Sequence, residues 1–233
     1  MRLSELYTSI QGEGPSVGRP TQFVRFAGCN LKCPGWPCDT QHAIDPKLYR
    51  NEWQTITPQE LLVRVERWPR AVTLTGGEPL LQPTDDMKYF TQTLLDRYYT
   101  LELFTNGTFE LPAWARDFHT RIIMDWKLPG SGEDPYNQQR IQNVRHHLGR
   151  YDAVKFVCAN RSDFDLAHDL KAAYVDNDPE RAPWNTPHVY VGVAWGLLEE
   201  AELVEWILKA KIDNLELNVQ VHNYIWPRDE RLR

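Results

Sequence analysis

The chain runs from a β-rich segment straight into a cysteine-rich loop, in Phe23-Val-Arg-Phe-Ala-Gly-Cys29-Asn-Leu-Lys-Cys33-Pro-Gly-Trp-Pro-Cys38. Three of its four cysteines lie within these last ten residues, close enough to converge on one metal centre. Structural zinc normally takes four Cys or His ligands, whereas a [4Fe–4S] cluster held by three cysteines keeps one iron free for another molecule. We therefore expect Cys29, Cys33 and Cys38 to hold an iron–sulfur cluster.

Two other interpretations of this loop stay open at this point. Asp39 and His42 follow closely enough to complete a zinc site, and a disulfide is a weaker alternative because four cysteines in 233 residues do not suggest a disulfide scaffold. The fourth cysteine, Cys158, ends the apolar run Ala153-Val-Lys-Phe-Val-Cys158. We expect it to be a buried strand residue rather than a ligand.

Composition favours one α/β domain that spans residues 1–233. With 42% hydrophobic and 12% aromatic residues, the chain can bury one substantial core. It has no apolar run near the roughly 20 residues that cross a bilayer and no charged-then-apolar leader, so we expect a soluble, cytoplasmic protein without membrane contact. The formal charge of −6 argues against direct binding of nucleic acid.

Short β-rich runs alternate with helical patterns along the chain, which predicts successive βα units and a mostly parallel sheet. The expected strands are 22–26, 72–75, 101–104, 122–124, 154–157, 189–191 and 215–218. The first clear helix opens at Thr57, which can form a capping box with Glu60. Further helices are expected over 85–99, 163–174 and 198–211, the second of them capped by Ser162. Residues 176–187 are expected to form a surface loop.

Polar residues follow four consecutive predicted strands. They are the cysteine loop, Thr75-Gly-Gly-Glu78, Thr105-Asn-Gly-Thr108 and Asp125-Trp-Lys127. In sheets of this kind, the loops at the carboxyl ends of the strands form the ligand crevice. We therefore expect these four segments to meet at one mouth. Taken alone, the Gly pair and Asn106-Gly107 are more typical of tight turns than of a binding site.

The ends of the chain offer further candidates. Gln11 and Glu13 lie beside glycines before the first clear strand, and an amide next to a carboxylate can bind adjacent donors and acceptors of a guanine-like or pterin-like ring. From spacing alone, a polar glycine-rich turn explains Gln11 and Glu13 at least as well. Gln220 and His222 lie just beyond the last predicted strand and could close the same mouth.

The cysteine loop together with Thr75-Gly-Gly-Glu78-Pro resembles the radical S-adenosylmethionine superfamily. Within it, the chain is similar to the 7-carboxy-7-deazaguanine synthase family. That similarity rests on Ser9-Ile-Gln-Gly-Glu-Gly14, Phe23-Val-Arg-Phe-Ala-Gly-Cys-Asn-Leu31, Cys38-Asp-Thr40, Thr75-Gly-Gly-Glu-Pro-Leu-Leu-Gln82, Thr105-Asn-Gly-Thr108 and Val219-Gln-Val-His222. It runs from the N-terminus nearly to the C-terminus.

The resemblance implies an incomplete (β/α) barrel, a homodimer, and a carbon–nitrogen lyase of the queuosine type. This enzyme would convert 6-carboxy-5,6,7,8-tetrahydropterin to 7-carboxy-7-deazaguanine with release of ammonia. It would use a [4Fe–4S] cluster, S-adenosylmethionine and Mg²⁺, and a reducing partner such as flavodoxin or ferredoxin. The cofactor would perform the difficult step, while the protein orients the substrate and excludes water.

The resemblance also implies roles for individual residues. Cys29, Cys33 and Cys38, in a cluster loop of about 29–40, would hold the cluster, and Thr40 would hold Mg²⁺. The cofactor would meet Gly77, Asp125, Trp126 and Lys127. The pterin substrate would meet Ile10, Gln11, Gly12, Glu13, Arg25, Thr75, Gln220 and His222, with Arg25 pairing with its carboxylate.

Three positions depart from the family pattern. Four residues separate Cys33 from Cys38 where two are usual, the late strand ends in Val191-Gly-Val-Ala-Trp195 where a Gln-Pro pair is common, and residues 228–233 extend past the usual terminal carboxylate. Two rival functions remain. One is an activase that installs a glycyl radical on a partner enzyme. Gln11 and Glu13 together with Gln220 and His222 disfavour it, because they fit a small polar substrate better than a protein loop. The other is a non-catalytic zinc-binding module that uses the cysteines with His42 or Asp39.

Overall fold

A nine-stranded sheet forms the centre of the computed structural model, which describes residues 1–36, 38–116, 119–179, 181–227 and 231. The strand order is β3-β1-β2-β4-β5-β6-β7-β8-β9. The strands are β1 (Arg2–Ile10), β2 (Pro20–Phe26), β3 (Gln54–Thr55), β4 (Ala71–Gly76), β5 (Thr100–Thr105), β6 (Thr120–Trp126), β7 (Ala153–Cys158), β8 (His188–Val193) and β9 (Glu216–Leu217).

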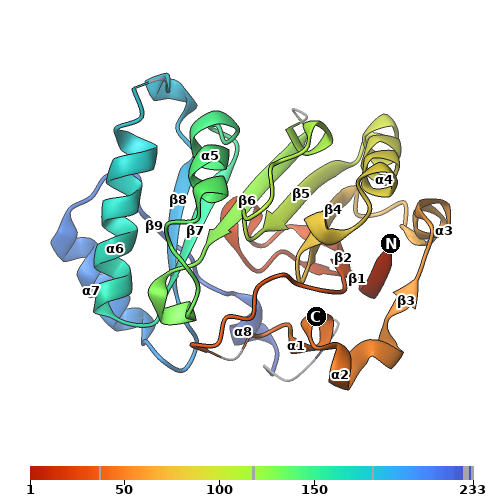
Figure 1. The fold of residues 1–233 in the computed structure, drawn as a ribbon, viewed down its shortest axis with the longest axis horizontal. Coiled ribbons are helices and arrows are strands. Elements are labelled where there is room, and N and C mark those ends of the chain that lie inside the picture. Colours follow the sequence, from red (N-terminus) through yellow and green to blue (C-terminus); the bar gives the residue numbers. More distant parts are fainter. Residues whose placement is uncertain (37, 117–118, 180, 228–230, 232–233) are drawn as a thin grey trace.

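From β2 to β9 all neighbouring strands are parallel, whereas β1 runs antiparallel to both β2 and β3. The sheet curves without joining its edge strands into a ring, so the predicted α/β fold with a mostly parallel, incomplete barrel is confirmed (Figure 1). Every predicted strand is present. Strands β1 and β3, which form the antiparallel part of the sheet, were not among the expected strands, the first of which begins at Gln22.

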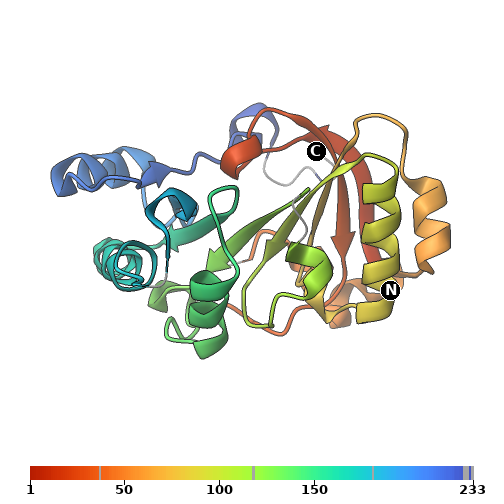
Figure 2. The ribbon, with the colours of Figure 1, turned by 90° about the horizontal axis from the view of Figure 1, so that it is seen from above.

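The longer helices pack along the outside of the curved sheet (Figure 2). The helices are α1 (Gln41–Ile44), α2 (Pro46–Tyr49), α3 (Pro58–Arg64), α4 (Thr84–Asp96), α5 (Gln138–His146), α6 (Arg161–Lys171), α7 (Glu200–Ala210) and α8 (His222–Ile225). The capping box of α3 is present, with Thr57 and Glu60 bonded to each other's backbone amides. Within the described residues, no helix is long and apolar enough to cross a membrane.

The helix predictions were wrong about one cap and missed α5 and the four-residue helices α1, α2 and α8. Helix α6 is capped by Asn160, whose side chain accepts a bond from the Asp163 amide at 3.0 Å, and not by Ser162, which lies inside the first turn. Helix α5 was not predicted at all. Its sequence, Gln-Gln-Arg-Ile-Gln-Asn-Val-Arg-His, is mostly polar, yet it buries Arg140 and Asn143 against backbone carbonyls.

Side chains alternate between the two faces of each central strand, as the period of two in a strand requires. Along β6, the even-numbered Ile122, Met124 and Trp126 enter the main core under the helices. The odd-numbered Ile123 belongs to a separate small cluster on the inner face, and Asp125 lines the inner cavity. The alternation therefore decides which residues reach the site.

Candidate functional site

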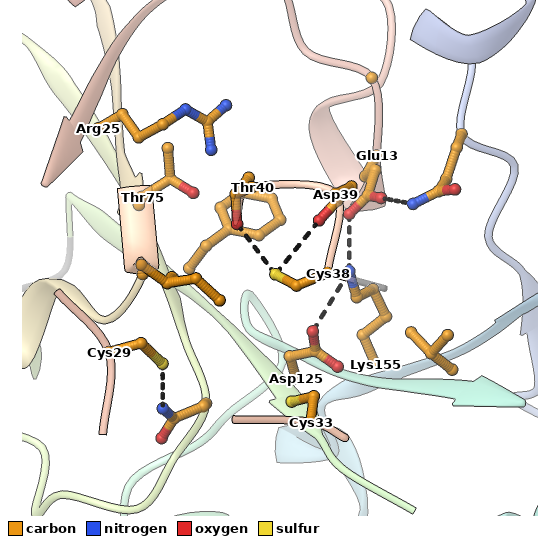
Figure 3. Close-up of a pocket in the computed structure, with 18 of the residues that line it drawn as sticks. Glu13, Arg25, Cys29, Cys33, Cys38, Asp39, Thr40, Thr75, Asp125 and Lys155 are labelled. Carbon is orange, nitrogen blue, oxygen red and sulfur yellow. Dashed lines mark hydrogen bonds and ion pairs between the residues drawn. The ribbon is translucent and has the colours of Figure 1, made fainter. Parts of the chain in front are cut away.

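A cavity of about 260 Å³ lies on the inner face at the carboxyl ends of the parallel strands (Figure 3). As predicted, the four polar segments that follow successive strands all contribute to it. The predicted site residues that line it are Ile10, Gln11, Gly12, Glu13, Arg25, Cys29, Cys33, Cys38, Thr40, Thr75, Gly77, Asp125, Lys127, Gln220 and His222.

The three clustered cysteines suit an iron–sulfur cluster. All are free thiols on the wall of this one cavity. Burial raises the pKa of each thiol, that of Cys33 to about 11. A cubane cluster spans more space than a single ion, so its ligands can stand farther apart than sulfurs that share one zinc with Zn–S bonds of about 2.3 Å.

The zinc alternative finds no support in the geometry. In the described part of the chain, no three His, Cys, Asp or Glu side chains gather closely enough to hold one metal ion. Nε2 of His42 lies 3.0 Å from the Glu5 carboxylate, so this histidine is engaged away from the cysteines. Asp39 Oδ1 lies 3.9 Å from the Cys38 sulfur, and this pair does not belong to a group of three possible ligands among the described residues.

The tip of β6 has the features of a cofactor-binding position. The Asp125 carboxylate accepts a bond from Lys127 Nζ at 2.7 Å through Oδ2, while its buried Oδ1 has no partner among the described residues. Buried polar atoms are normally bonded, so this oxygen is suited to a donor on a bound ligand. Gly77 packs against the backbone of Gly28, and a Cβ at Gly77 would overlap the Gly28 carbonyl. These features fit a cofactor with an amino group or hydroxyls.

A chain of alternating charges crosses the floor of the cavity (Figure 3). Lys155 Nζ lies 2.7 Å from Glu13 Oε2 and 3.7 Å from Asp125 Oδ2. Burial disfavours the charged forms, but the opposite charges outweigh it and keep the pKa of both Glu13 and Asp125 below the usual range. Lys155 was not among the predicted site residues. It links Glu13, which follows β1, to Asp125 on β6.

Arg25 lies beside Thr75 on the neighbouring strand, since the two are register partners of β2 and β4. Its Nε donates to Glu5 Oε2 and its Nη2 to the Tyr7 hydroxyl, both at 3.0 Å. Two residues of β1 therefore fix the guanidinium at the cavity wall. The remaining nitrogen, Nη1, makes no hydrogen bond within the described chain, so it is free to bind an anionic ligand.

The Gln11 amide is held in one orientation. Its Nε2 donates to Glu102 Oε2 at 2.9 Å and to the Thr73 hydroxyl at 3.1 Å. Its Oε1 accepts the Glu13 amide at 3.3 Å and retains one lone pair. Gln11 can therefore offer an acceptor to a ligand, and Glu102, which was not predicted, sets that orientation.

The segment that follows β9 borders the cavity through Gln220 and His222, the two residues expected there. Gln220 Nε2 donates to Glu13 Oε1 at 2.5 Å. The His222 ring packs so closely on Gly12 that a Cβ there would overlap it. Gln220 and His222 thus both contact the segment of residues 11–13 at the cavity.

Buried Glu78 bonds its own loop to the loop that follows β5. Its carboxylate accepts bonds from the Thr105 hydroxyl at 2.9 Å and from the amides of Asn106 and Leu80 at 2.7 and 3.0 Å. The Asn106 side chain in turn lies 3.9 Å from the Cys29 sulfur. Burial raises the pKa of Glu78 to about 7.

Trp126 is the one predicted site residue whose side chain does not line the cavity. It is fully buried in the core, where it packs on Phe156 and Tyr174 and donates through Nε1 to the Pro135 carbonyl. The same alternation buries Cys158 at the end of β7, which confirms that this cysteine is a core residue.

Known proteins resemble the chain over its whole length. It is 30% identical to the 7-carboxy-7-deazaguanine synthase of Clostridium acetobutylicum, over 99% of this chain and 98% of that protein. It is 31% identical to the 7-carboxy-7-deazaguanine synthase of Chlorobaculum tepidum, over 99% of this chain and 96% of that protein. No protein-family model matches the chain.

Two solved structures share its fold. The crystal structure of QueE from Escherichia coli superposes with a TM-score of 0.70 over 95% of this chain and 94% of that chain, at 22% identity. SuiB of Streptococcus suis gives a TM-score of 0.53 over 84% of this chain and 47% of that chain, at 11% identity. The chain therefore belongs to the 7-carboxy-7-deazaguanine synthase family of radical S-adenosylmethionine enzymes, a membership that implies S-adenosylmethionine and a [4Fe–4S] cluster as its cofactors.

Proposed function

We propose that the cavity binds 6-carboxy-5,6,7,8-tetrahydropterin and converts it to 7-carboxy-7-deazaguanine and ammonia, with Cys29, Cys33 and Cys38 as ligands of the [4Fe–4S] cluster. One observation carries this proposal. The three free cysteines and a set of polar groups suited to a small anionic heterocycle line the same cavity, at the carboxyl ends of parallel strands.

Each side of the cavity has its own task in this proposal. Arg25, held by Glu5 and Tyr7, pairs with the substrate carboxylate, while Gln11 and Glu13 accept bonds from the nitrogens of the pterin ring. Thr75, Ile10, Gly12, Gln220 and His222 complete the substrate side. Gly77, Asp125 and Lys127 meet S-adenosylmethionine, with the unpartnered Asp125 oxygen accepting from it.

The bound cluster and S-adenosylmethionine supply the one-electron chemistry that activates a C–H bond of the substrate. The chain's own residues bind both molecules next to each other and keep water away. The Glu13–Lys155–Asp125 ion pairs fix the two sides relative to each other, because each carboxylate shares the buried ammonium group. Such preorganised charges need no rearrangement when the ligands react.

We also propose that Thr40 supplies an oxygen to Mg²⁺ next to the substrate carboxylate. Thr40 precedes α1, but its side chain does not cap that helix. Its hydroxyl lies on the cavity wall, 3.3 Å from the Cys38 sulfur. A hydroxyl that is not used in capping suits a hard cation such as Mg²⁺. A homodimer, a flavodoxin or ferredoxin as reductant, and a cytoplasmic location remain predictions.

The test is an anaerobic assay of the reconstituted protein with reductant, S-adenosylmethionine, Mg²⁺ and 6-carboxytetrahydropterin, with products identified by mass. We expect 7-carboxy-7-deazaguanine from the wild-type protein and from Cys158→Ala, which serves as the matched cysteine control. Cys29→Ala, Cys33→Ala and Cys38→Ala should lose both cluster and product. A cluster that persists in any of these three would refute the ligand assignment, and 5′-deoxyadenosine without the deazaguanine would refute the substrate.

A further inference from the structure

The cluster loop rests on the turn that follows β6. The backbone amides of Lys32 and Cys33 both donate to Oε1 of Glu133, at 2.9 and 2.8 Å. Two residues later, the Gly35 amide donates to the Ser131 carbonyl at 2.9 Å. Three amides of the loop are therefore held by one short segment that is about a hundred residues away in sequence.

The backbone of the loop needs such support. Cys33 has a φ of 43°, in the left-handed region that a residue with a side chain seldom adopts. Conformations of this kind are unfavourable by themselves and persist where the surroundings fix them. Cys33 lines the cavity in this conformation.

Loop and turn also pack with almost no space between them. A Cβ on Gly35 would overlap the Gly130 carbonyl, and a Cβ on Gly132 would overlap the Pro34 ring. The turn itself is anchored, because the Gly130 amide donates to Asp163 at 2.9 Å and the buried Ser131 hydroxyl donates to the Leu128 carbonyl at 2.6 Å. These bonds hold the turn that carries Glu133 in place.

We propose that Glu133 is a positioning residue: it holds Cys33 in the backbone conformation that presents its sulfur to the cluster. The Glu133 contact would also allow the loop to carry four residues between Cys33 and Cys38, since it fixes the first of these cysteines independently of the loop's length. The inference rests on the proposed cluster ligands.

The experiment uses the full-length protein, reconstituted under anaerobic conditions and exposed to an iron chelator. Iron, sulfide and visible absorbance are followed over time. Glu133→Ala loses both hydrogen bonds, so we expect it to lose its cluster about tenfold faster than the wild type. Glu133→Gln keeps an oxygen that can accept both bonds and should restore most of the retention. Asp134→Ala removes a carboxylate from the same turn without touching the loop and should behave as the wild type.

A fourth variant keeps the test decisive if Glu133→Ala does not fold, as judged by circular dichroism. Glu133→Asp retains the charge but is one methylene too short to reach the two amides, so it should lose the cluster as the alanine variant does. Wild-type cluster retention in Glu133→Asp or in a folded Glu133→Ala would overturn the inference. If the wild-type protein itself takes up no cluster, the proposed ligand set has failed, and the role of Glu133 fails with it.

Discussion

Arg25 illustrates how single residues in this site are fixed before a ligand arrives. Its guanidinium is bonded to Glu5 and Tyr7, and the Glu5 carboxylate is shared with His42 and Arg231 at 3.0 and 2.9 Å. Burial acts to raise the pKa of Glu5, but the bond and charge of His42 and the charge of Arg25 lower it to about 2. Glu5 therefore stays ionised and keeps Arg25 in place.

We predict that Arg25→Ala weakens substrate binding without preventing cleavage of S-adenosylmethionine. Hydrogen bonds to charged groups contribute about 1.5–3 kcal/mol, so the KM for the pterin should rise roughly ten- to a hundredfold. Steady-state kinetics, with 5′-deoxyadenosine and product measured separately, will show the split. Arg64→Ala, on the exposed face of α3, is the matched control. An unchanged KM in Arg25→Ala would contradict the pairing with the carboxylate.

The free energy of unfolding should depend on pH because the pKa of Glu78 is raised in the folded protein. Burial raises its pKa to about 7 from an ordinary value of 4.5. The unfolded chain then loses this proton at lower pH than the folded chain does. Below about pH 4.5 both states hold the proton, and between 4.5 and 7 deprotonation favours the unfolded state. The free energy of unfolding should thus fall by on the order of 3 kcal/mol across this window because of this one group.

Glu78→Gln cannot ionise, and it should remove this part of the pH dependence. We predict that the Tm of the apoprotein falls with rising pH, between about 5 and 7.5, more steeply in the wild type than in Glu78→Gln. The comparison is between slopes, because the amide also disturbs the hydrogen bonds from Thr105 and Asn106 at every pH. Parallel Tm profiles would show that Glu78 is ionised in both states.

At the scale of elements, the sequence predicts a strand or helix where the buried positions are regularly spaced and apolar. The apolar core strands could be predicted because each presents Val, Ile or Leu to the core. Strand β1 could not, because Glu5, a charged residue, occupies one of its buried positions. Helix α5 could not either, since its buried Arg140 and Asn143 are satisfied only by carbonyls of a distant loop.

The site residues that belong to motifs were predicted, whereas Lys155 was missed and Trp126 was misplaced although the alternation of side chains along their strands decides both. Lys155 is a charged residue within the apolar run of β7, and its odd number places it opposite Val154 and Phe156, on the inner face. The alternation along β7 could therefore have placed Lys155 in the site from the sequence alone. The same reasoning sends Trp126 to the core and Asp125 to the cavity. Glu102 and Glu133 are different, because their partners become neighbours only through the fold.

The N-cap of α6 can be tested by comparing two alanine variants at the start of the same helix. We predict that Asn160→Ala lowers the free energy of unfolding by about 1 kcal/mol, since it removes the acceptor for the Asp163 amide. Ser162→Ala should change it by much less, because Ser162 caps nothing and alanine is favoured in a helix. Chemical denaturation of both variants measures the difference. Equal effects would mean that the cap does not stabilise the helix.

At the scale of the whole molecule, the segment after β1 meets the segment after β9 at the opening of the barrel. The Val221 amide donates to the Gly12 carbonyl at 3.0 Å, and the Gly14 amide donates to Asn218 Oδ1 at 3.0 Å. Strands β1 and β9 lie near opposite edges of the sheet, so these bonds join its two sides at the cavity. The site is complete only when the C-terminal segment is in place.

Gly12→Ala tests this closure. The new Cβ would overlap the His222 ring, so the C-terminal segment must move, and overpacking of this kind destabilises a protein by about 1–3 kcal/mol. We predict a lower Tm and weaker pterin binding, with the cluster retained. In a His222→Ala background the ring is absent, and Gly12→Ala should then cost much less stability, which a double-mutant cycle measures. An equal loss in both backgrounds would show that His222 does not pack on Gly12, and the proposed closure of the cavity by the C-terminal segment would have to be abandoned.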